Sequence, residues 1–283
     1  MILKACTCSR EEDMGTCCFC TFINDVKPRP LDHRDVYQQV EIVPRKRGTF
    51  VAKSVAPDGL PPNFLRRKGW SLYASTPKDF QLGEAHGVDH ALRSRLPPFD
   101  FPISNNHSTS VVVGKWYVPF MFVKEDGISL KDQVKQSVYY EMCLEQLWEE
   151  IHACENHAGV EGKAVAVSRT VRRERATVFG EEAVTNAVDG VMWLRGGVNS
   201  RGVGLGTVVV DRMKWEAGIG GWIDGRERDV KVERVEECGE VNGWRKFGCY
   251  MLVERFVLKR LDGSVVLTYD FKHFNMIRSK WEY

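Results

Sequence analysis

Residues 248–271 read GCYMLVERFVLKRLDGSVVLTYDF, two runs rich in β-branched and aromatic residues on either side of an Asp-Gly pair. Such a pair is typical of the type I′ turn between antiparallel strands, because this turn needs positive φ angles at both central residues. The stretch therefore predicts one long β-hairpin with Asp262 and Gly263 at the centre of its turn. Three cross-strand pairs follow from this register: Leu258 with Leu267, Phe256 with Tyr269, and Arg255 with Asp270.

Glu254 is the one residue of this hairpin that does not suit its place. The register puts it on the apolar face beside Leu252 and Phe256, whereas the Arg255 and Asp270 pair is expected on the outer face. Burying an isolated carboxylate is costly, so Glu254 must be paired, be neutral or open into a cleft. Pairing with an arginine is the ordinary explanation, and a functional carboxyl group with a shifted pKa is the alternative.

The rest of the second half continues the series of strands. Short apolar runs recur at regular spacing between Gly-rich turns, which is typical of a sandwich or barrel rather than a βαβ fold. Residues 138–154 fit both helical and strand spacing, and a strand is favoured for the part near Tyr140. Residues 205–215 are also predicted as a strand. We therefore predict a mainly β protein, with an α+β N-terminal part over residues 1–107 and a jelly-roll-like antiparallel β-sandwich over residues 108–283.

Composition points to an ordinary globular protein. The chain has 283 residues, of which 43% are hydrophobic and 28% are charged, and this excludes the disordered class. The formal net charge is only +2 with the two signs interspersed, so a nucleic-acid partner is not indicated. No apolar run reaches the about 18 residues that a transmembrane segment needs.

Nine cysteines, an odd number, and the lack of an export signal favour a reducing compartment. We predict a cytoplasmic or nucleocytoplasmic protein. The chain opens directly on a strand-like run at residues 3–8, so its N-terminal part is expected to be truncated.

Six strings carry a family resemblance: TCCFC at 16–20, DVKPRPL at 25–31, FLRRKGW at 64–70, GKWY at 114–117, DGVMW at 189–193 and the whole of residues 243–282. On these strings the chain resembles the plant-specific domain-of-unknown-function family 1262. That family has no established activity, cofactor or catalytic residues, so the resemblance implies a plant protein and no particular chemistry. Its members usually extend further at the N-terminus.

A shorter similarity involves Gly243-Trp244-Arg245 and the strand residues 253–258 that follow. These residues resemble the closing strands of the phloem lectins and related plant jelly-roll proteins. The similarity implies carbohydrate binding only by analogy of fold, and a fold does not by itself imply a function.

Metal and cofactor motifs are weak throughout. Cys6, Cys8 and the Cys17-Cys18-Phe19-Cys20 run suggest either a zinc site or buried small side chains, and their spacing favours burial. His86 and His90, near Glu84 and Asp89, would share one face of a helix predicted over residues 86–96, but the glutamate of the zinc-protease motif is missing, so a solvated helix end is favoured. Residues 202–206 superficially match a phosphate loop, yet the strand-like run after them argues against it. We predict no metal, no cofactor and no catalytic residues.

The aromatic residues provide the candidate ligand-binding set. Stacking platforms for sugar rings are built from such side chains, although large sandwiches also need aromatic residues as core filler. The candidates are Trp116, Trp193, Trp215, Trp222 and Trp244, with Glu254 added from the hairpin.

A non-enzymatic binding or interaction protein is the leading hypothesis, with a carbohydrate or a protein as its ligand. An enzyme with a site near Glu254 and a membrane-active protein with an exposed amphipathic hairpin are the alternatives. Three short basic clusters, at residues 45–47, 66–68 and 172–175, are typical of solvated turns, and an anionic partner is the other interpretation.

Overall fold

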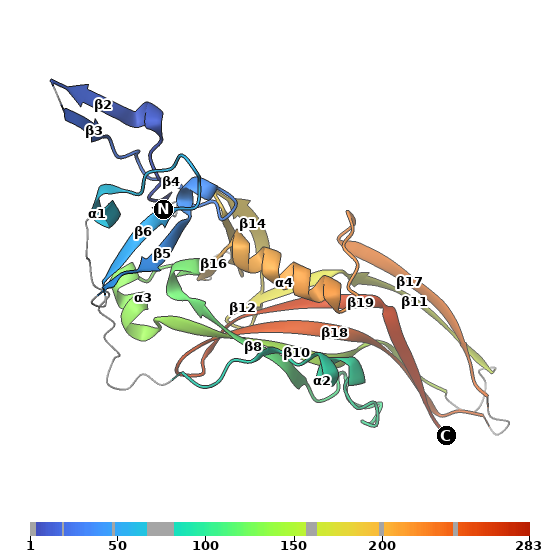
Figure 1. Cartoon of the computed structure of the whole chain (residues 1–283). Coiled ribbons are helices and arrows are strands. Elements are labelled where there is room, and N and C mark those ends of the chain that lie inside the picture. Colours follow the sequence, from blue (N-terminus) through green and yellow to red (C-terminus); the bar gives the residue numbers. More distant parts are fainter. Residues whose placement is uncertain are drawn as a thin grey trace. The chain divides into compact units, whose positions relative to one another are not determined.

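The computed structural model describes residues 4–18, 20–46, 49–66, 82–156, 163–197, 201–239 and 243–283. Strands dominate over helices (Figure 1), so the predicted mainly β class is confirmed. Every strand pairing whose register is described is antiparallel. No helix in this described part is long and apolar enough to cross a membrane.

The chain divides into two compact units. The first consists of Met1–Gly83 with Ala187–Val191, and the second of Glu84–Asn186 with Met192–Tyr283. The boundary predicted after residue 107 lies inside the second unit.

The first unit contains short paired strands and one helical turn. Its elements are β1 (Lys4–Ala5) paired with β4 (Arg29–Pro30), the hairpin of β2 (Met14–Cys17) and β3 (Cys20–Ile23), the hairpin of β5 (Val40–Pro44) and β6 (Phe50–Ser54), and α1 (Asn63–Arg66).

The second unit is built on a seven-stranded sheet. Its order is β13 (Glu181–Glu182), β12 (Glu174–Val178), β19 (Val265–Glu282), β18 (Lys246–Arg260), β10 (Tyr139–Glu155), β8 (Val111–Pro119) and β7 (Gly87–Val88). A two-stranded ribbon joins β11 (Ala164–Arg172) to β17 (Asp229–Glu237), and a four-stranded sheet has the order β14 (Val184–Val188), β15 (Val191–Arg195), β16 (Gly202–Gly206) and β9 (Val123–Glu125). The helices are α2 (His90–Arg95), α3 (Leu130–Gln136) and α4 (Thr207–Ile219).

The predicted hairpin is β18 and β19, and its register is confirmed. Leu258 pairs with Leu267, Phe256 with Tyr269 and Arg255 with Asp270. The predicted turn is wrong, because the amide of Gly263 donates to the carbonyl of Arg260 and places Leu261 and Asp262 at the centre. Of Leu261, Asp262 and Gly263, only Gly263 has a positive φ, of 85°. A register shift between Leu258 and Lys259 absorbs the difference, as in hairpins that carry a bulge beside the turn.

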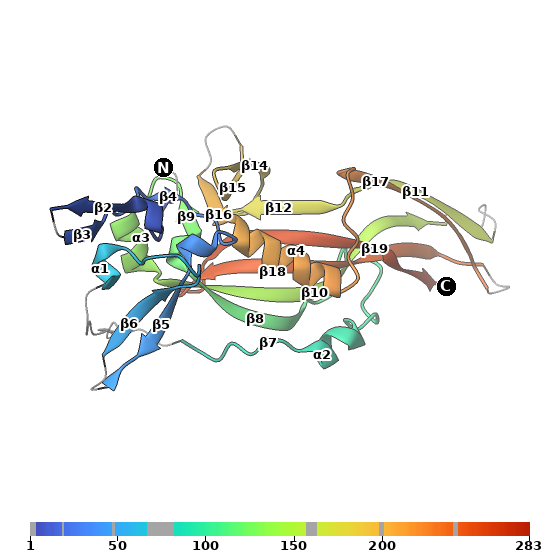
Figure 2. The same ribbon diagram turned by 45° about the horizontal axis from the view of Figure 1, so that its top comes forward.

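One face of the seven-stranded sheet packs on α4 and on the four-stranded sheet (Figure 2). Leu194 of β15 and Leu205 of β16 share a buried cluster with Leu144 and Phe256, so two sheets enclose this core as a sandwich. The prediction of a strand over residues 205–215 is wrong. The β-branched run after Gly206 favoured a strand, but Val210, Met213 and Ala217 recur at helical spacing and bury one face of α4.

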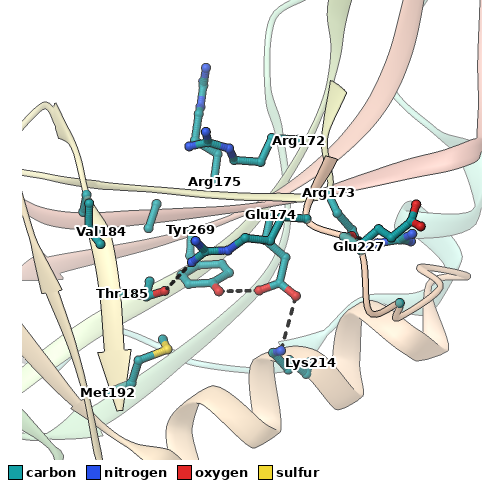
Figure 3. A pocket seen from close by; sticks show the side chains of 14 residues that line it. Arg172, Arg173, Glu174, Arg175, Val184, Thr185, Met192, Lys214, Glu227 and Tyr269 are labelled. Carbon is teal, nitrogen blue, oxygen red and sulfur yellow. Dashed lines mark hydrogen bonds and ion pairs between the residues drawn. The ribbon is translucent and has the colours of Figure 1, made fainter. Parts of the chain in front are cut away.

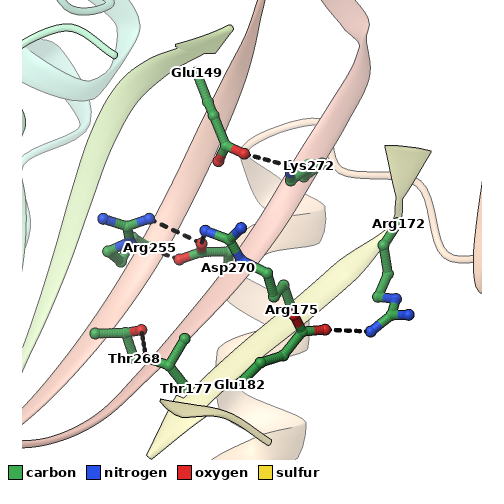
Figure 4. Close-up of polar contacts among 9 residues, drawn as sticks. All are labelled: Glu149, Arg172, Arg175, Thr177, Glu182, Arg255, Thr268, Asp270 and Lys272. Carbon is green, nitrogen blue, oxygen red and sulfur yellow. Dashed lines mark hydrogen bonds and ion pairs between the residues drawn. The ribbon is translucent and has the colours of Figure 1, made fainter. Parts of the chain in front are cut away.

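The opposite face of the sheet is covered in part by the ribbon of β11 and β17. Val165 and Val167 of β11 pack with Phe247 and Cys249 of β18 in a second buried cluster. The remainder of this face carries ion pairs and paired hydroxyl groups (Figure 4). The sheet therefore has an apolar inner face and an outer face that is polar in its middle.

Candidate ligand-binding site

The five candidate tryptophans lie in different environments. Trp222 and Trp244 are buried in two separate hydrophobic clusters. The Trp222 ring meets Phe271 edge-to-face at 5.0 Å between centroids, and Trp244 meets Trp281 in the same way at 5.3 Å. These two side chains act as core filler.

Two further tryptophans meet cationic side chains near the surface. Trp215 lies on α4 and is 55% exposed, with the guanidinium of Arg212 4.2 Å from the ring centre. Trp193 on β15 is half-buried, and Lys124 and Arg195 each lie 5.5 Å from its ring centre. Intramolecular cation–π contacts therefore occupy both rings.

Trp116 on β8 is the candidate tryptophan that lines a described cavity. It is half-buried and lies nearly parallel to Phe256, with an interplanar angle of 24° and 6.2 Å between ring centres. The cavity beside it has a volume of about 260 Å³ and mostly apolar walls. We call it the Trp116 groove.

Glu254 is completely buried and is held by an arginine. Arg93 of α2 donates from Nε to Oε1 at 2.7 Å and from Nη2 to Oε2 at 2.6 Å. Gln146 donates to Oε1 at 3.0 Å, and the Nε2 atom of His273 lies 3.3 Å from Oε2. Both oxygens are thus engaged by protein groups, as the ordinary structural explanation requires.

The environment of Glu254 keeps its carboxyl group ionised. Burial alone raises its pKa, but the contacts with His273 and Arg93 outweigh burial and hold the pKa below its ordinary value. An ionised carboxylate that is enclosed by donors is typical of a structural ion pair.

Three sequence motifs lie in surroundings that differ from the prediction: the N-terminal cysteines, His86 with His90, and the Gly-rich run at residues 202–206. The N-terminal cysteines were expected to be buried. Cys8 is buried, but Cys6, Cys17, Cys18 and Cys20 are exposed. No group of three or more His, Cys, Asp or Glu side chains in the described part of the chain could hold a metal ion.

The other two motifs are His86 with His90 and the Gly-rich run. His86 precedes β7, and α2 begins only at His90, so the prediction of one shared helical face is wrong. The glycines of residues 202–206 lie inside β16 and are buried. A helix does follow them, contrary to the strand expected there, but the glycines form no loop that could cradle a phosphate.

The basic cluster at residues 172–175 is not a solvated turn. Arg172 ends β11 and Glu174 begins β12, so the cluster lies where the chain passes from the ribbon into the sheet. Arg173 donates from Nη1 to the carbonyl of Ile223 at 2.6 Å and from Nε to that of Glu227 at 3.2 Å. It thereby anchors the segment that precedes β17.

A cavity of about 420 Å³ opens at this cluster, within the size range of small-molecule sites (Figure 3). Its cationic lining residues are Arg172, Arg173, Arg175, Lys214 and Arg228, and its acidic ones are Glu174 and Glu227. Met192, Ala176 and Val184 add an apolar side. We call this cavity the arginine cleft.

Tyr269, Glu174 and Lys214 form a connected polar group in the cleft. The hydroxyl of the buried Tyr269 donates to Glu174, and the ammonium of Lys214 on α4 lies 3.2 Å from Oε1 of Glu174 (Figure 3). Burial and the neighbouring Glu174 carboxylate raise the pKa of Tyr269 well above its ordinary value. The phenol therefore stays protonated, and it fixes Glu174 rather than acting as a base.

Arg228 completes the cleft from the segment before β17. Its Nη2 atom donates to the hydroxyl of Thr185 at 3.4 Å, a long contact, and its backbone carbonyl accepts from the amide of Arg173 at 2.7 Å. Sequence reasoning did not select Tyr269, Lys214 or Arg228. The basic cluster was the one pattern that pointed toward them.

No protein-family model matches the chain, and no curated protein matches it. Among solved structures, a match is the crystal structure of Cry35Ab1, with a TM-score of 0.42 and 13% sequence identity. It covers 90% of this chain and 70% of that one. A likeness at this level supports no inference about function.

Proposed function

We propose that the protein is a non-enzymatic binding protein whose ligand is a small anionic carbohydrate, a sugar that carries a carboxylate or a phosphate, held in the arginine cleft. The observation that carries the proposal is the lining of this cleft, where Arg173, Lys214 and Arg228 lie beside Glu174 and Glu227. Arg172 and Arg175 also line it, but they pair with Glu182 and Asp270. Cationic side chains that outnumber the carboxylates of a concave site attract anions.

The cationic groups keep donors for a ligand. In the described part of the chain, the ammonium of Lys214 contacts one carboxylate, that of Glu174. The side chain of Arg228 makes one long hydrogen bond there. Since an ammonium has three N–H donors and a guanidinium five, both can bind an incoming anion.

The remaining lining suits a sugar. Thr185 and Glu227 offer a hydroxyl and a carboxylate to sugar hydroxyl groups, and Met192 with Ala176 offers an apolar side to a ring face. Neither alternative function has comparable support. An enzyme with a site at Glu254 would need an open cleft there, and Glu254 is completely buried. A membrane-active protein would need an exposed amphipathic hairpin, and the ribbon of β11 and β17 buries Val165, Val167 and Val232 inside the fold.

The test is isothermal titration calorimetry with glucose 6-phosphate, glucuronate and glucose. We expect the two anionic sugars to bind and glucose to bind at least about tenfold more weakly. Affinity should also fall when salt is raised from about 50 mM to about 200 mM.

Two variants locate the site. Lys214→Met and Arg228→Met should each weaken binding of the anionic sugars by about tenfold or more. Arg226→Met is the matched control, because Arg226 lies in the same segment as Arg228 but not in the lining of the cleft. Equal binding of glucose and glucose 6-phosphate, or an equal loss in the control, would contradict the proposal.

Membership of the plant family and a cytoplasmic or nucleocytoplasmic location are part of the same proposal. Their support is the set of strings that resemble the family, together with the odd number of cysteines. A fluorescent fusion expressed in plant cells tests the location, and secretion of the fusion would contradict it.

A further inference from the structure

The β2–β3 hairpin of the first unit carries three cysteines at its turn (Figure 1). Cys17 is the last residue of β2, Cys20 is the first residue of β3, and Cys18 lies in the two-residue connection between the strands. All three thiols are free and exposed. They are therefore open to reagents in solution.

Cys17 and Cys20 are direct cross-strand partners. The next pair on the same face of the hairpin is Gly15 with Phe22. The ring of Phe22 covers Gly15 so closely that a Cβ atom there would lie 2.5 Å from it. An aromatic ring over a cross-strand glycine fixes the strand register, and this register holds the two thiols opposite each other.

Opposed strand positions have the geometry that a disulfide needs. Their Cα atoms are about 5.5 Å apart in a hydrogen-bonded pair and about 4.5 Å apart in a non-hydrogen-bonded pair. Both separations lie within the range of about 4.4–6.8 Å that disulfides span between Cα atoms. The two side chains also project from one face. Cys17 and Cys20 can therefore be joined without a large movement of the backbone.

Other thiols of the chain are less suited to this chemistry. Cys143 and Cys249 are buried, and burial is the main cause that raises the pKa of each thiol to about 11. They stay protonated, whereas the thiolate is the reactive form. Cys6 is exposed, but no described strand pairing places another cysteine opposite it. It serves as an internal reference for a single exposed thiol.

We propose that Cys17 and Cys20 are a redox-active thiol pair, which a small-molecule disulfide of the glutathione type oxidises to one reversible disulfide. In a reducing compartment the pair rests as two thiols and closes only when the oxidant accumulates. An exposed disulfide is among the more easily reduced ones, so added thiol reopens it. This site is independent of ligand binding in the arginine cleft.

Closure takes two thiol–disulfide exchange steps. The thiolate of one cysteine attacks a sulfur of glutathione disulfide, forms a mixed disulfide and releases one glutathione, which takes up a proton. The opposed cysteine then loses its proton and attacks the protein sulfur of the mixed disulfide, and the second glutathione leaves. The protein loses two hydrogen atoms, and one glutathione disulfide is reduced to two glutathione molecules.

The test is a titration of the whole folded chain with glutathione disulfide at neutral pH. Remaining thiols are blocked with N-ethylmaleimide, and the peptides are mapped by mass spectrometry. We expect a Cys17–Cys20 disulfide without bound glutathione. It should be half-formed at a concentration at least about tenfold below the one that half-modifies Cys6, because the second step is intramolecular. A lasting glutathione adduct on Cys17 or Cys20, or oxidation only at the concentration that modifies Cys6, would overturn the proposal.

Single substitutions separate the opposed thiols from their neighbour in the turn. Cys17→Ser and Cys20→Ser should each abolish closure and accumulate a glutathione adduct on the remaining partner. Cys18→Ser is the matched control, since it removes an exposed thiol from the same turn, and it should keep the disulfide. Dithiothreitol should return both thiols of the oxidised wild type to their maleimide-reactive form. Loss of closure in Cys18→Ser, or a link from Cys18 to either partner in the wild type, would contradict the assignment.

Discussion

Adjacent residues of β18 make two arginine–carboxylate pairs on opposite faces of one sheet. On the inner face, Glu254 binds Arg93 through two hydrogen bonds. On the outer face, Arg255 binds Asp270 through two as well, at 2.6 and 2.9 Å (Figure 4). Both carboxylates are almost completely buried, Glu254 at 0% and Asp270 at 1% exposure.

The two pairs differ in their cations. The side chain of Arg93 is 6% exposed, whereas that of Arg255 is 27% exposed and reaches solvent. Asp270 also has a second cation, Arg175, at 3.4 Å. Similar pair geometry therefore need not mean similar energetics, because breaking a pair leaves more uncompensated charge where neither water nor a second arginine reaches the carboxylate.

Removing Arg93 should have the largest effect. Arg93→Met leaves Glu254 buried without its cation, and we expect the free energy of unfolding to fall by about 3–5 kcal/mol. Urea denaturation followed by circular dichroism measures it. Arg95→Met, an exposed position on the same helix, is the control and should change stability by less than about 0.5 kcal/mol.

The double variant Arg93→Met/Glu254→Met separates lost attraction from stranded charge. If the stranded carboxylate dominates, the double variant should be more stable than Arg93→Met alone. A double variant that is still less stable would show that packing around the pair carries the loss.

Removing Arg255 should have a smaller effect. Arg255→Met leaves Asp270 with Arg175 and with access to water through the gap, so we expect a loss of about 1–2 kcal/mol in the same denaturation measurement. Adding Arg175→Met should then increase the loss. A cost equal to that of Arg93→Met would break the distinction between the two faces.

Mild acid should have the smallest effect. The pKa of Glu254 is held below its ordinary value of 4.5, so its ionised form contributes stability above that pH, and the contribution is lost as pH falls through the lower folded value. The stability gap between the wild type and Glu254→Gln should stay constant near neutral pH and shrink below about pH 4.5. A gap that shrinks between pH 7 and 6 would mean a raised pKa instead.

The pairing of β18 with β19 could be predicted from the sequence on both faces, whereas the elements that pack on the inner face could not. The Asp-Gly pair and strand alternation are local patterns, so they fixed which residues oppose one another across β18 and β19. The helix α4 was missed although Val210, Met213 and Ala217 have helical spacing. The β-branched run at its start pointed the other way, and burial against the sheet decided the outcome.

The sequence by itself determined that Arg255 meets Asp270 and that Glu254 falls among apolar neighbours. Only the tertiary structure decided what Glu254 meets, because Arg93 is 161 residues away in the chain and arrives on a short helix whose path no local pattern records. The same is true of the arginine cleft, where Lys214 of α4 and Tyr269 of β19 meet through Glu174 of β12. Cross-strand partners follow from a two-residue period, but partners brought together from distant elements depend on how those elements pack.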